Sequence, residues 1–254
     1  MMAGATAGPR PLVAAHRGGA LLWPENSLTA FRGALALGVD LLELDVHLSR
    51  DGEVVVIHDP TLERTTTGRG AAADHAAADL AAIALRGAGG EGVPRLRAVL
   101  DLAKPTPVRL LVEIKVGVDR GRYAGIEAKV LGLLRDTGLL ERTTVMAFEW
   151  DTLERLRALD PTARLTGLLS RRGAEQQGGI RAAAERLARL GANDLGIERT
   201  LLSPDAVAAA RAAGLTIGVW TVNDAEDLRR ALDSGVDYVT TDRPDLALQL
   251  RGAR

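Results

Sequence analysis

Residues able to do acid–base or metal chemistry are concentrated in the stretch 43–59, E-L-D-V-H-L-S-R-D-G-E-V-V-V-I-H-D, which reads as two strands around a turn. The dipeptide Asp51-Gly52 predicts a two-residue type I′ hairpin, because both central residues of that turn need positive φ. In that register Asp45 lies opposite His58, and directly opposed residues point to the same side of a sheet. Alternation along the strand adds Glu43 to this side. One hairpin is therefore predicted to gather two carboxylates and a histidine.

A surface hairpin with a polar outer face is the alternative interpretation of this stretch. However, Leu41-Leu42 before it and the apolar run 54–57 near its end predict strands buried in a barrel or sheet. Carboxylates inside a buried strand must be paired or bind a metal. His47 shares the face of the carboxylates but lies farther out along the hairpin, so we expect it at the rim rather than among metal ligands.

Further candidates stand at the ends of other predicted strands. The first strand ends in His16-Arg17, the strand before residue 116 carries Glu113 and Lys115, and a late strand ends in Trp220. Alternation places Glu113 and Lys115 on one face of their strand. In a β/α barrel the C-terminal ends of all strands meet at one rim, where active sites lie. We therefore expect these residues to converge from distant parts of the chain.

The carboxylates define a metal chemistry. Glu43, Asp45 and Glu113 offer hard oxygen ligands, which suit one divalent cation, Mg²⁺ or Ca²⁺. The chain contains no cysteine, so disulfides and thiolate metal sites are excluded.

The remaining candidates define a phosphate and proton chemistry. Arg17, through its planar fork, and Lys115, as a point charge, can bind a phosphate. His16 and His58 can transfer protons near neutral pH. A divalent metal, two cations and two histidines suit phosphodiester cleavage, because the cations stabilise growing negative charge while one histidine serves each side.

The elements that would position these residues alternate regularly. Parallel-type strands are predicted near residues 12, 41, 110, 145, 166, 196, 217 and 238. Eight βα units in 254 residues predict an α/β fold of the (β/α)8 TIM-barrel class, as one domain over 1–254. The competing architecture, an open doubly wound sheet, would usually carry G-x-G-x-x-G after its first strand, where this chain has H-R-G-G-A.

Helices are predicted between these strands. Asn26 or Ser27 caps the first, Pro94 lies in the first turn of another, and a single helix is expected near 174–190. The strand 53–58 is an extra, antiparallel partner of the second strand. Residues 60–94 break the rhythm, with one helix near 76–85, and we predict a small inserted segment there.

Composition limits the partners. The 46% apolar and 26% charged residues are typical of a soluble globular protein, and a net charge of −1 gives no general attraction to nucleic acid or anionic membranes. Residues 1–11 lack the apolar core of a signal peptide, and no apolar run reaches the ~18 residues of a membrane helix. We expect a cytoplasmic protein without stable membrane insertion; the oligomeric state stays open.

Six motifs occur together: H-R-G-x-x-x-x-x-P-E-N-S, E-L-D-V, D-G-x-x-V-V-x-H-D-P-T-L-x-R-T-T, E-I-K, W-T-V-N-D and T-D-R-P-D. From His16 to Asp245 this set resembles the glycerophosphodiester phosphodiesterase family. The resemblance implies a barrel with an inserted segment after the H-D motif. It also implies divalent-cation-dependent hydrolysis of small glycerophosphodiesters to sn-glycerol 3-phosphate and an alcohol, by attack of the substrate's own hydroxyl through a cyclic phosphate.

The resemblance also implies roles for individual residues. Carried over, they are His16 and His58 as the acid–base pair; Glu43, Asp45 and Glu113 as metal ligands; Arg17 and Lys115 on the phosphate; and Trp220 against the substrate. Departures from the family pattern include Ala147-Phe148 where serine-phenylalanine is common. The alanine-rich segment 60–94 also predicts a different pocket for the alcohol.

Two other functions remain as alternatives. A phospholipase D-like relative acting on lysophospholipids or sphingolipids would need apolar loops for a lipid tail, which the sequence does not indicate. A catalytically silent barrel that binds phosphate esters would have lost at least one of the charged or imidazole residues, and none is lost. Glu198 is a further candidate to contact substrate hydroxyls, and Asp242 and Arg243 are expected to pair near the closing seam of the barrel.

Overall fold

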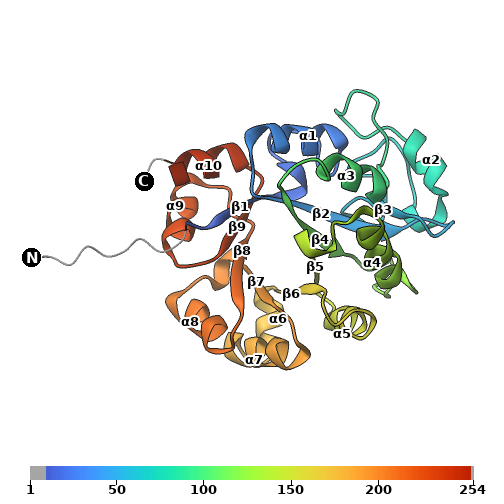
Figure 1. Cartoon of the computed structure of the whole chain (residues 1–254). Coiled ribbons are helices and arrows are strands. Elements are labelled where there is room, and N and C mark those ends of the chain that lie inside the picture. Colours follow the sequence, from blue (N-terminus) through green and yellow to red (C-terminus); the bar gives the residue numbers. More distant parts are fainter. Residues whose placement is uncertain (1–9, 253–254) are drawn as a thin grey trace, which may run out of the picture.

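Strands and helices alternate along the chain and close into a barrel with the helices outside (Figure 1). The computed structural model describes residues 10–252. Most of residues 1–11, where no signal peptide is expected, therefore lies outside the described residues. Within that range the sheet has nine strands, and β1 pairs with both β9 and β2, which closes the ring. The predicted (β/α)8 barrel is confirmed.

All strands except one run parallel. The parallel strands are β1 (Leu12–Ala15), β2 (Leu41–Leu48), β4 (Arg109–Ile114), β5 (Thr143–Ala147), β6 (Arg164–Leu169), β7 (Asp194–Glu198), β8 (Thr216–Trp220) and β9 (Tyr238–Thr241). The exception is β3 (Val54–Val56), which pairs antiparallel with β2. The strands expected near eight positions and the extra antiparallel strand are all present.

The helices lie between the strands. They are α1 (Leu28–Leu37), α2 (Ala77–Ala82), α3 (Leu96–Ala103), α4 (Ile126–Thr137), α5 (Trp150–Leu159), α6 (Arg171–Gln176), α7 (Ile180–Leu190), α8 (Pro204–Ala212), α9 (Ala225–Asp233) and α10 (Pro244–Gly252). Ser27 is the N-cap of α1, since its hydroxyl accepts a hydrogen bond from the Ala30 backbone N–H at 3.0 Å.

Two helix predictions were wrong. The single helix near 174–190 is two, because Gly178 and Gly179 take positive φ values of 78° and 104° that end α6 before α7 begins. Pro94 lies before α3 instead of in its first turn. Its carbonyl accepts a hydrogen bond from the Val56 N–H at 2.8 Å, which keeps this stretch extended beside β3.

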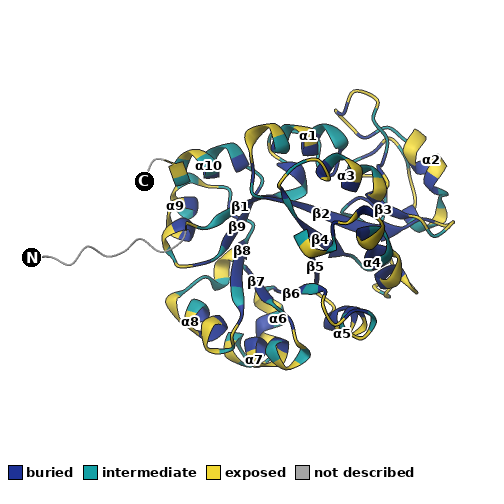
Figure 2. Cartoon of the chain, in the orientation of Figure 1, coloured by how far each residue is buried: buried dark blue, intermediate teal, exposed yellow. Residues whose placement is uncertain are grey.

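The core has two layers around the strands. Outward-facing residues such as Leu44 and Val112 pack against the apolar faces of the helices, and Figure 2 shows these helix faces buried and the outer faces exposed. A smaller cluster fills the barrel interior and includes Tyr238. A side chain at Gly218 would overlap the Tyr238 ring, so the glycine lets this ring lie across the barrel below the rim.

The predicted register of the β2–β3 hairpin was off by one residue. Leu48 pairs with Val54 and Val46 with Val56, and the Ser49 N–H donates to the Glu53 carbonyl at 2.9 Å. The loop therefore has three residues, with Gly52 at φ 76° as its left-handed residue. Asp45 then stands opposite position 57 rather than His58, whose side chain reaches the barrel mouth from beyond the end of β3.

Residues 60–94 contain α2 and form a small layer at one end of the β2–β3 hairpin (Figure 1). Their apolar residues, with two from the edge of the hairpin, make a hydrophobic cluster separate from the main core. That this is an inserted segment within a single domain stays a prediction. None of the described helices has both the length and the apolar character needed to cross a membrane.

Candidate active site

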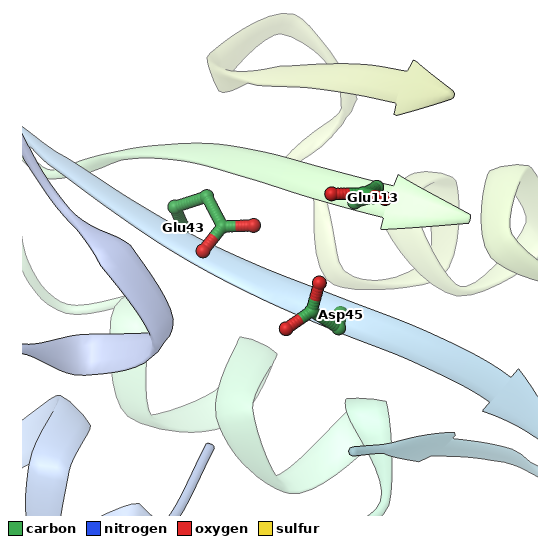
Figure 3. A group of neighbouring side chains, drawn as sticks. All are labelled: Glu43, Asp45 and Glu113. Carbon is green, nitrogen blue, oxygen red and sulfur yellow. The ribbon is translucent and has the colours of Figure 1, made fainter. Parts of the chain in front are cut away.

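Three carboxylates point into one space between β2 and β4 (Figure 3). Their ligand oxygens lie within 4.8 Å of one another, and the residues Glu43, Asp45 and Glu113 are 2%, 0% and 7% exposed. The sheet explains the grouping: Asp45 pairs directly with Glu113 across the two strands, and Glu43 is two residues earlier on the same face. Alternation, not the misjudged hairpin register, brings them together.

Two cations lie against these carboxylates. Lys115 Nζ is 3.0 Å from Asp45 Oδ1 and 2.5 Å from Glu113 Oε1, and Arg17 Nε is 3.3 Å from Asp45 Oδ2. Arg17 also donates its backbone N–H to Glu43 Oε2 at 2.8 Å, from the 3₁₀ turn η1 (His16–Gly18). Both cations that the sequence assigns to phosphate thus border the acidic cluster.

The cluster is short of positive charge. Burial, together with the nearby Asp45 and Glu113 carboxylates, raises the pKa of Glu43 to about 8. Burial would also raise the pKa of Asp45, but Lys115 and Arg17 beside it hold that pKa below its ordinary value. A divalent cation among the three carboxylates would supply the missing charge, and their oxygens are the donors that Mg²⁺ and Ca²⁺ prefer. The residues present therefore fit one such ion.

His16 is held by a residue from the far end of the chain. Its Nδ1 lies 2.6 Å from Asp242 Oδ1, and since a carboxylate at neutral pH only accepts, Nδ1 carries the proton of this bond. The other ring nitrogen, Nε2, is 4.0 Å from Glu43 Oε2. Burial works to lower the pKa of His16, but Glu43 and Asp242 outweigh it and raise that pKa.

His58 is held in the same way by its neighbour. Its Nδ1 lies 2.6 Å from Asp59 Oδ1, which leaves Nε2 for proton transfer. Burial is the main reason that the pKa of His58 lies below its ordinary value, and the nearby Lys115 and Arg17 charges add to the effect. Both histidines thus present one ring nitrogen to the site while an aspartate holds the other.

His47 is not the rim residue that the sequence predicts. It is fully buried, and burial lowers its pKa to about 4. Its Nε2 must donate to the His58 carbonyl at 3.0 Å, because a carbonyl only accepts, and its Nδ1 then accepts from the Tyr123 hydroxyl at 2.8 Å. His47 therefore supports the backbone of His58 from below.

A cavity of about 170 Å³ opens at the C-terminal ends of the strands. It is lined by both histidines, both cations, Glu43, Glu113 and Trp220. Trp220 donates its indole N–H to the Gly196 carbonyl at 3.0 Å and packs edge-on against Phe148, with ring centroids 5.3 Å apart. The ring therefore faces the barrel mouth, as the sequence predicts.

A larger hollow of about 800 Å³ lies at the opposite end of the barrel. It is lined by residues such as Arg109, Arg164 and Asp194 at the N-terminal ends of the strands. None of the predicted site residues borders it, so size is a poor guide here and the smaller cavity is the candidate active site.

Sequence reasoning missed the residues that orient the site. Asp242 does not pair with Arg243, which instead binds Asp245 at 2.9 Å; Asp242 binds His16 and accepts from Asn223 Nδ2 at 2.6 Å. Only the T-D-R-P-D and W-T-V-N-D motifs could have pointed to this contact. Glu198, which was a candidate to contact substrate hydroxyls, does not line the cavity. Its carboxylate accepts a hydrogen bond from the Arg171 N–H at 2.9 Å instead.

Asn26 was one of the two residues expected to cap α1, a role that Ser27 takes. The Asn26 side chain instead donates to Asp45 Oδ2 at 2.8 Å, from a backbone with φ 55°. Asn26 therefore occupies a lone pair of the carboxylate and fixes its orientation beside Arg17.

Comparison with known proteins gives one consistent family. Residues 16–246 match the Glycerophosphoryl diester phosphodiesterase family. The chain is 32% identical over 249 residues to a glycerophosphodiester phosphodiesterase of Caldanaerobacter subterraneus, covering 95% of this chain and 98% of that protein.

Two solved structures show the same fold. A glycerophosphodiester phosphodiesterase from Agrobacterium tumefaciens matches with a TM-score of 0.80 at 29% identity, over 94% of this chain and 99% of the other. An Oleispira antarctica phosphodiesterase in complex with the product sn-glycerol-3-phosphate matches with a TM-score of 0.82 at 26% identity, over 95% and 96% of the two chains.

Proposed function

The chain belongs to the glycerophosphoryl diester phosphodiesterase family, and we propose that His16 and His58 are the acid–base pair with which it hydrolyses glycerophosphodiesters. The products are sn-glycerol 3-phosphate and an alcohol. The observation that carries the proposal is the paired arrangement of the histidines. Each is held at Nδ1 by an aspartate at 2.6 Å, and both line the cavity that also contains Glu43 and Glu113.

The proposed roles follow from position and charge. Arg17 and Lys115 bind the phosphate oxygens and stabilise the negative charge that grows as the P–O bond breaks. One histidine accepts the proton of the attacking hydroxyl, and the other donates a proton to the departing alcohol oxygen. Trp220 packs against the glycerol part of the substrate.

Glu43, Asp45 and Glu113 would hold one divalent cation, which when bound supplies Lewis-acid stabilisation of the phosphate oxygens. We propose Mg²⁺ or Ca²⁺, because the ligand set consists of carboxylates. Lys115 Nζ contacts two of these carboxylates, so its ammonium group is within reach of a phosphate bound at the same place. Attack by the substrate's own hydroxyl, with a cyclic phosphate intermediate, stays a prediction that ³¹P NMR of the reaction can test.

One assay tests the proposed function. Purified protein is incubated with glycerophosphocholine, glycerophosphoethanolamine or glycerophosphoglycerol, in Mg²⁺, Ca²⁺ or EDTA, and glycerol 3-phosphate is measured. We expect release with one of the metals and none in EDTA. No release under any metal would contradict the proposal.

Exposed apolar side chains favour lysophospholipids as a second substrate class. Val118 and Phe148 are 59% and 40% exposed, and both line a second cavity that shares His58 and Lys115 with the first. The sequence alone did not predict the apolar loops that a lipid tail would need. A lysophospholipid added to the same assay tests this class, with release of phosphorylated glycerol lipid instead of glycerol 3-phosphate. The cytoplasmic location stays a prediction that cell fractionation can test.

A further inference from the structure

Two side chains of the segment 60–94 bind it to the loop and helix that follow β1. Glu91 accepts hydrogen bonds from the Thr29 N–H at 3.1 Å, the Thr29 hydroxyl at 2.7 Å and Arg32 Nη1 at 3.2 Å. Arg64 makes the other connection, to Glu25. Both contacts lie at the surface, but the contact made by Arg64 also adjoins residues of the proposed active site.

Arg64 forms a double fork with two carboxylates. Its Nε and Nη2 donate to Asp59 at 2.6 and 3.0 Å, and its Nη1 and Nη2 donate to Glu25 at 2.7 and 2.8 Å. Such bidentate pairs fix geometry as well as charge. Isolated surface ion pairs contribute little, and Arg64 is 46% exposed, but a four-bond network of this geometry is a stronger constraint.

Each carboxylate that Arg64 binds also holds a residue of the proposed active site. Asp59 Oδ1 accepts from His58 Nδ1 at 2.6 Å, and Glu25 Oε1 accepts from Arg17 Nη1 at 3.0 Å. These are the same two oxygens that Arg64 Nη2 contacts. A single guanidinium nitrogen therefore lies between the group that holds His58 and the group that holds Arg17.

We propose that Arg64 is a positioning residue for the hydrolysis, which fixes His58 and Arg17 relative to each other so that both face one phosphate. The segment 60–94 thereby contributes a side chain that orients the active site. The inference rests on the proposed roles of His58 and Arg17.

The charges support this arrangement. Hydrogen bonds from Arg64 are the main cause that lowers the pKa of Asp59 to about 2. Burial would raise the pKa of Glu25, but Arg64 and Arg17 keep it below its ordinary value. Both carboxylates are therefore ionised at neutral pH and accept from both of their partners.

The test compares Arg64→Ala with Glu91→Ala, which removes the other link of the same segment without touching a site residue. We expect Arg64→Ala to lower kcat by about 10- to 100-fold, because a small misplacement of reacting groups has effects of that size. Guanidinium ion at millimolar concentration should restore part of this loss. Arg64→Lys should stay impaired, because an ammonium group cannot bind both carboxylates bidentately.

The control separates positioning from mere docking of the segment. We expect Glu91→Ala to keep the wild-type kcat and to be insensitive to guanidinium, even if its melting temperature falls as much as that of Arg64→Ala. Three results would overturn the inference: a near-normal kcat in Arg64→Ala, a loss that guanidinium does not reverse, or an equal loss in Glu91→Ala. Wild-type protein in the same assay separates failure of this inference from failure of the proposed function, which predicts wild-type hydrolysis.

Discussion

Replacing Asp242 by asparagine should reverse the tautomer of His16. Asn223 Oδ1 accepts from the backbone N–H of residue 242 at 2.8 Å, which fixes the amide so that its Nδ2 donates to Asp242 Oδ2. An asparagine at 242 must therefore offer its oxygen to Asn223 and its NH₂ to His16 Nδ1. The proton of neutral His16 then moves to Nε2, the nitrogen that faces the cavity.

The size of the effect follows from the contact that is lost. A hydrogen bond to a charged group contributes about 1.5–3 kcal/mol, which corresponds to about 10- to 150-fold in rate. If the wrong tautomer removes the proton transfer by His16 altogether, the loss approaches the roughly 10²–10⁴-fold of a positioned acid or base. We therefore expect kcat to fall by about 10²–10⁴-fold in Asp242→Asn.

The assay is glycerol 3-phosphate release at saturating substrate, with thermal unfolding as a check on folding. Asp245→Asn is the matched control, because Asp245 is a nearby carboxylate that accepts hydrogen bonds from the Arg243 side chain rather than from a histidine. We expect the control to keep its kcat. An Asp242→Asn enzyme with nearly normal kcat would refute the argument that Asp242 sets the tautomer of His16.

Three further predictions concern the site and the fold. His16→Ala and His58→Ala should each lower turnover by roughly 10²–10⁴-fold in the same assay, and near-normal activity in either would reject its assignment. Glu43→Gln should raise the metal concentration for half-maximal activity on the order of tenfold, because the ligand set loses a charge; an unchanged metal titration would reject Glu43 as a ligand. Asp160→Asn should lower the free energy of unfolding by about 1–2 kcal/mol at neutral pH, because hydrogen bonds from Thr162 and Arg135 lower the pKa of Asp160 to about 2. That contribution is present above the unfolded pKa near 4 and is lost as pH falls through about 2, so denaturant unfolding should show the wild-type advantage shrinking over that range.

The grouping of the carboxylates could be predicted because it depends on strand periodicity. Glu43 and Asp45 are two residues apart on β2, and Glu113 lies on the adjacent β4 directly beside Asp45. Alternation alone puts such residues on one face, whatever the register of the hairpin. The eight βα units could likewise be predicted from the regular alternation of the elements.

The turn of the hairpin could not be predicted from its dipeptide. Asp51 does not take the positive φ that a type I′ turn needs; its carboxylate accepts from the Ser49 hydroxyl at 2.6 Å and from the Ala77 N–H at 2.9 Å. The second contact is with the start of α2 and depends on tertiary structure. A D-G pair therefore signals a turn, while distant contacts decide its length.

The residues that orient the histidines were beyond sequence reasoning for a similar reason. Asp242 is 226 positions from His16, and they meet only because β9 pairs with β1 when the barrel closes. His47 was misjudged because Tyr123, which covers it, arrives from a loop that the strand pattern does not describe.

The central claim is that three carboxylates bind one divalent cation beside the two histidines. Calorimetric titration of the EDTA-treated protein with Mg²⁺ or Ca²⁺ tests it most directly, with Asp45→Asn as the comparison. The account predicts one ion bound per chain in the wild type and strongly weakened binding in the variant. Equal binding by both proteins, or no binding of either ion by the wild type, would contradict it.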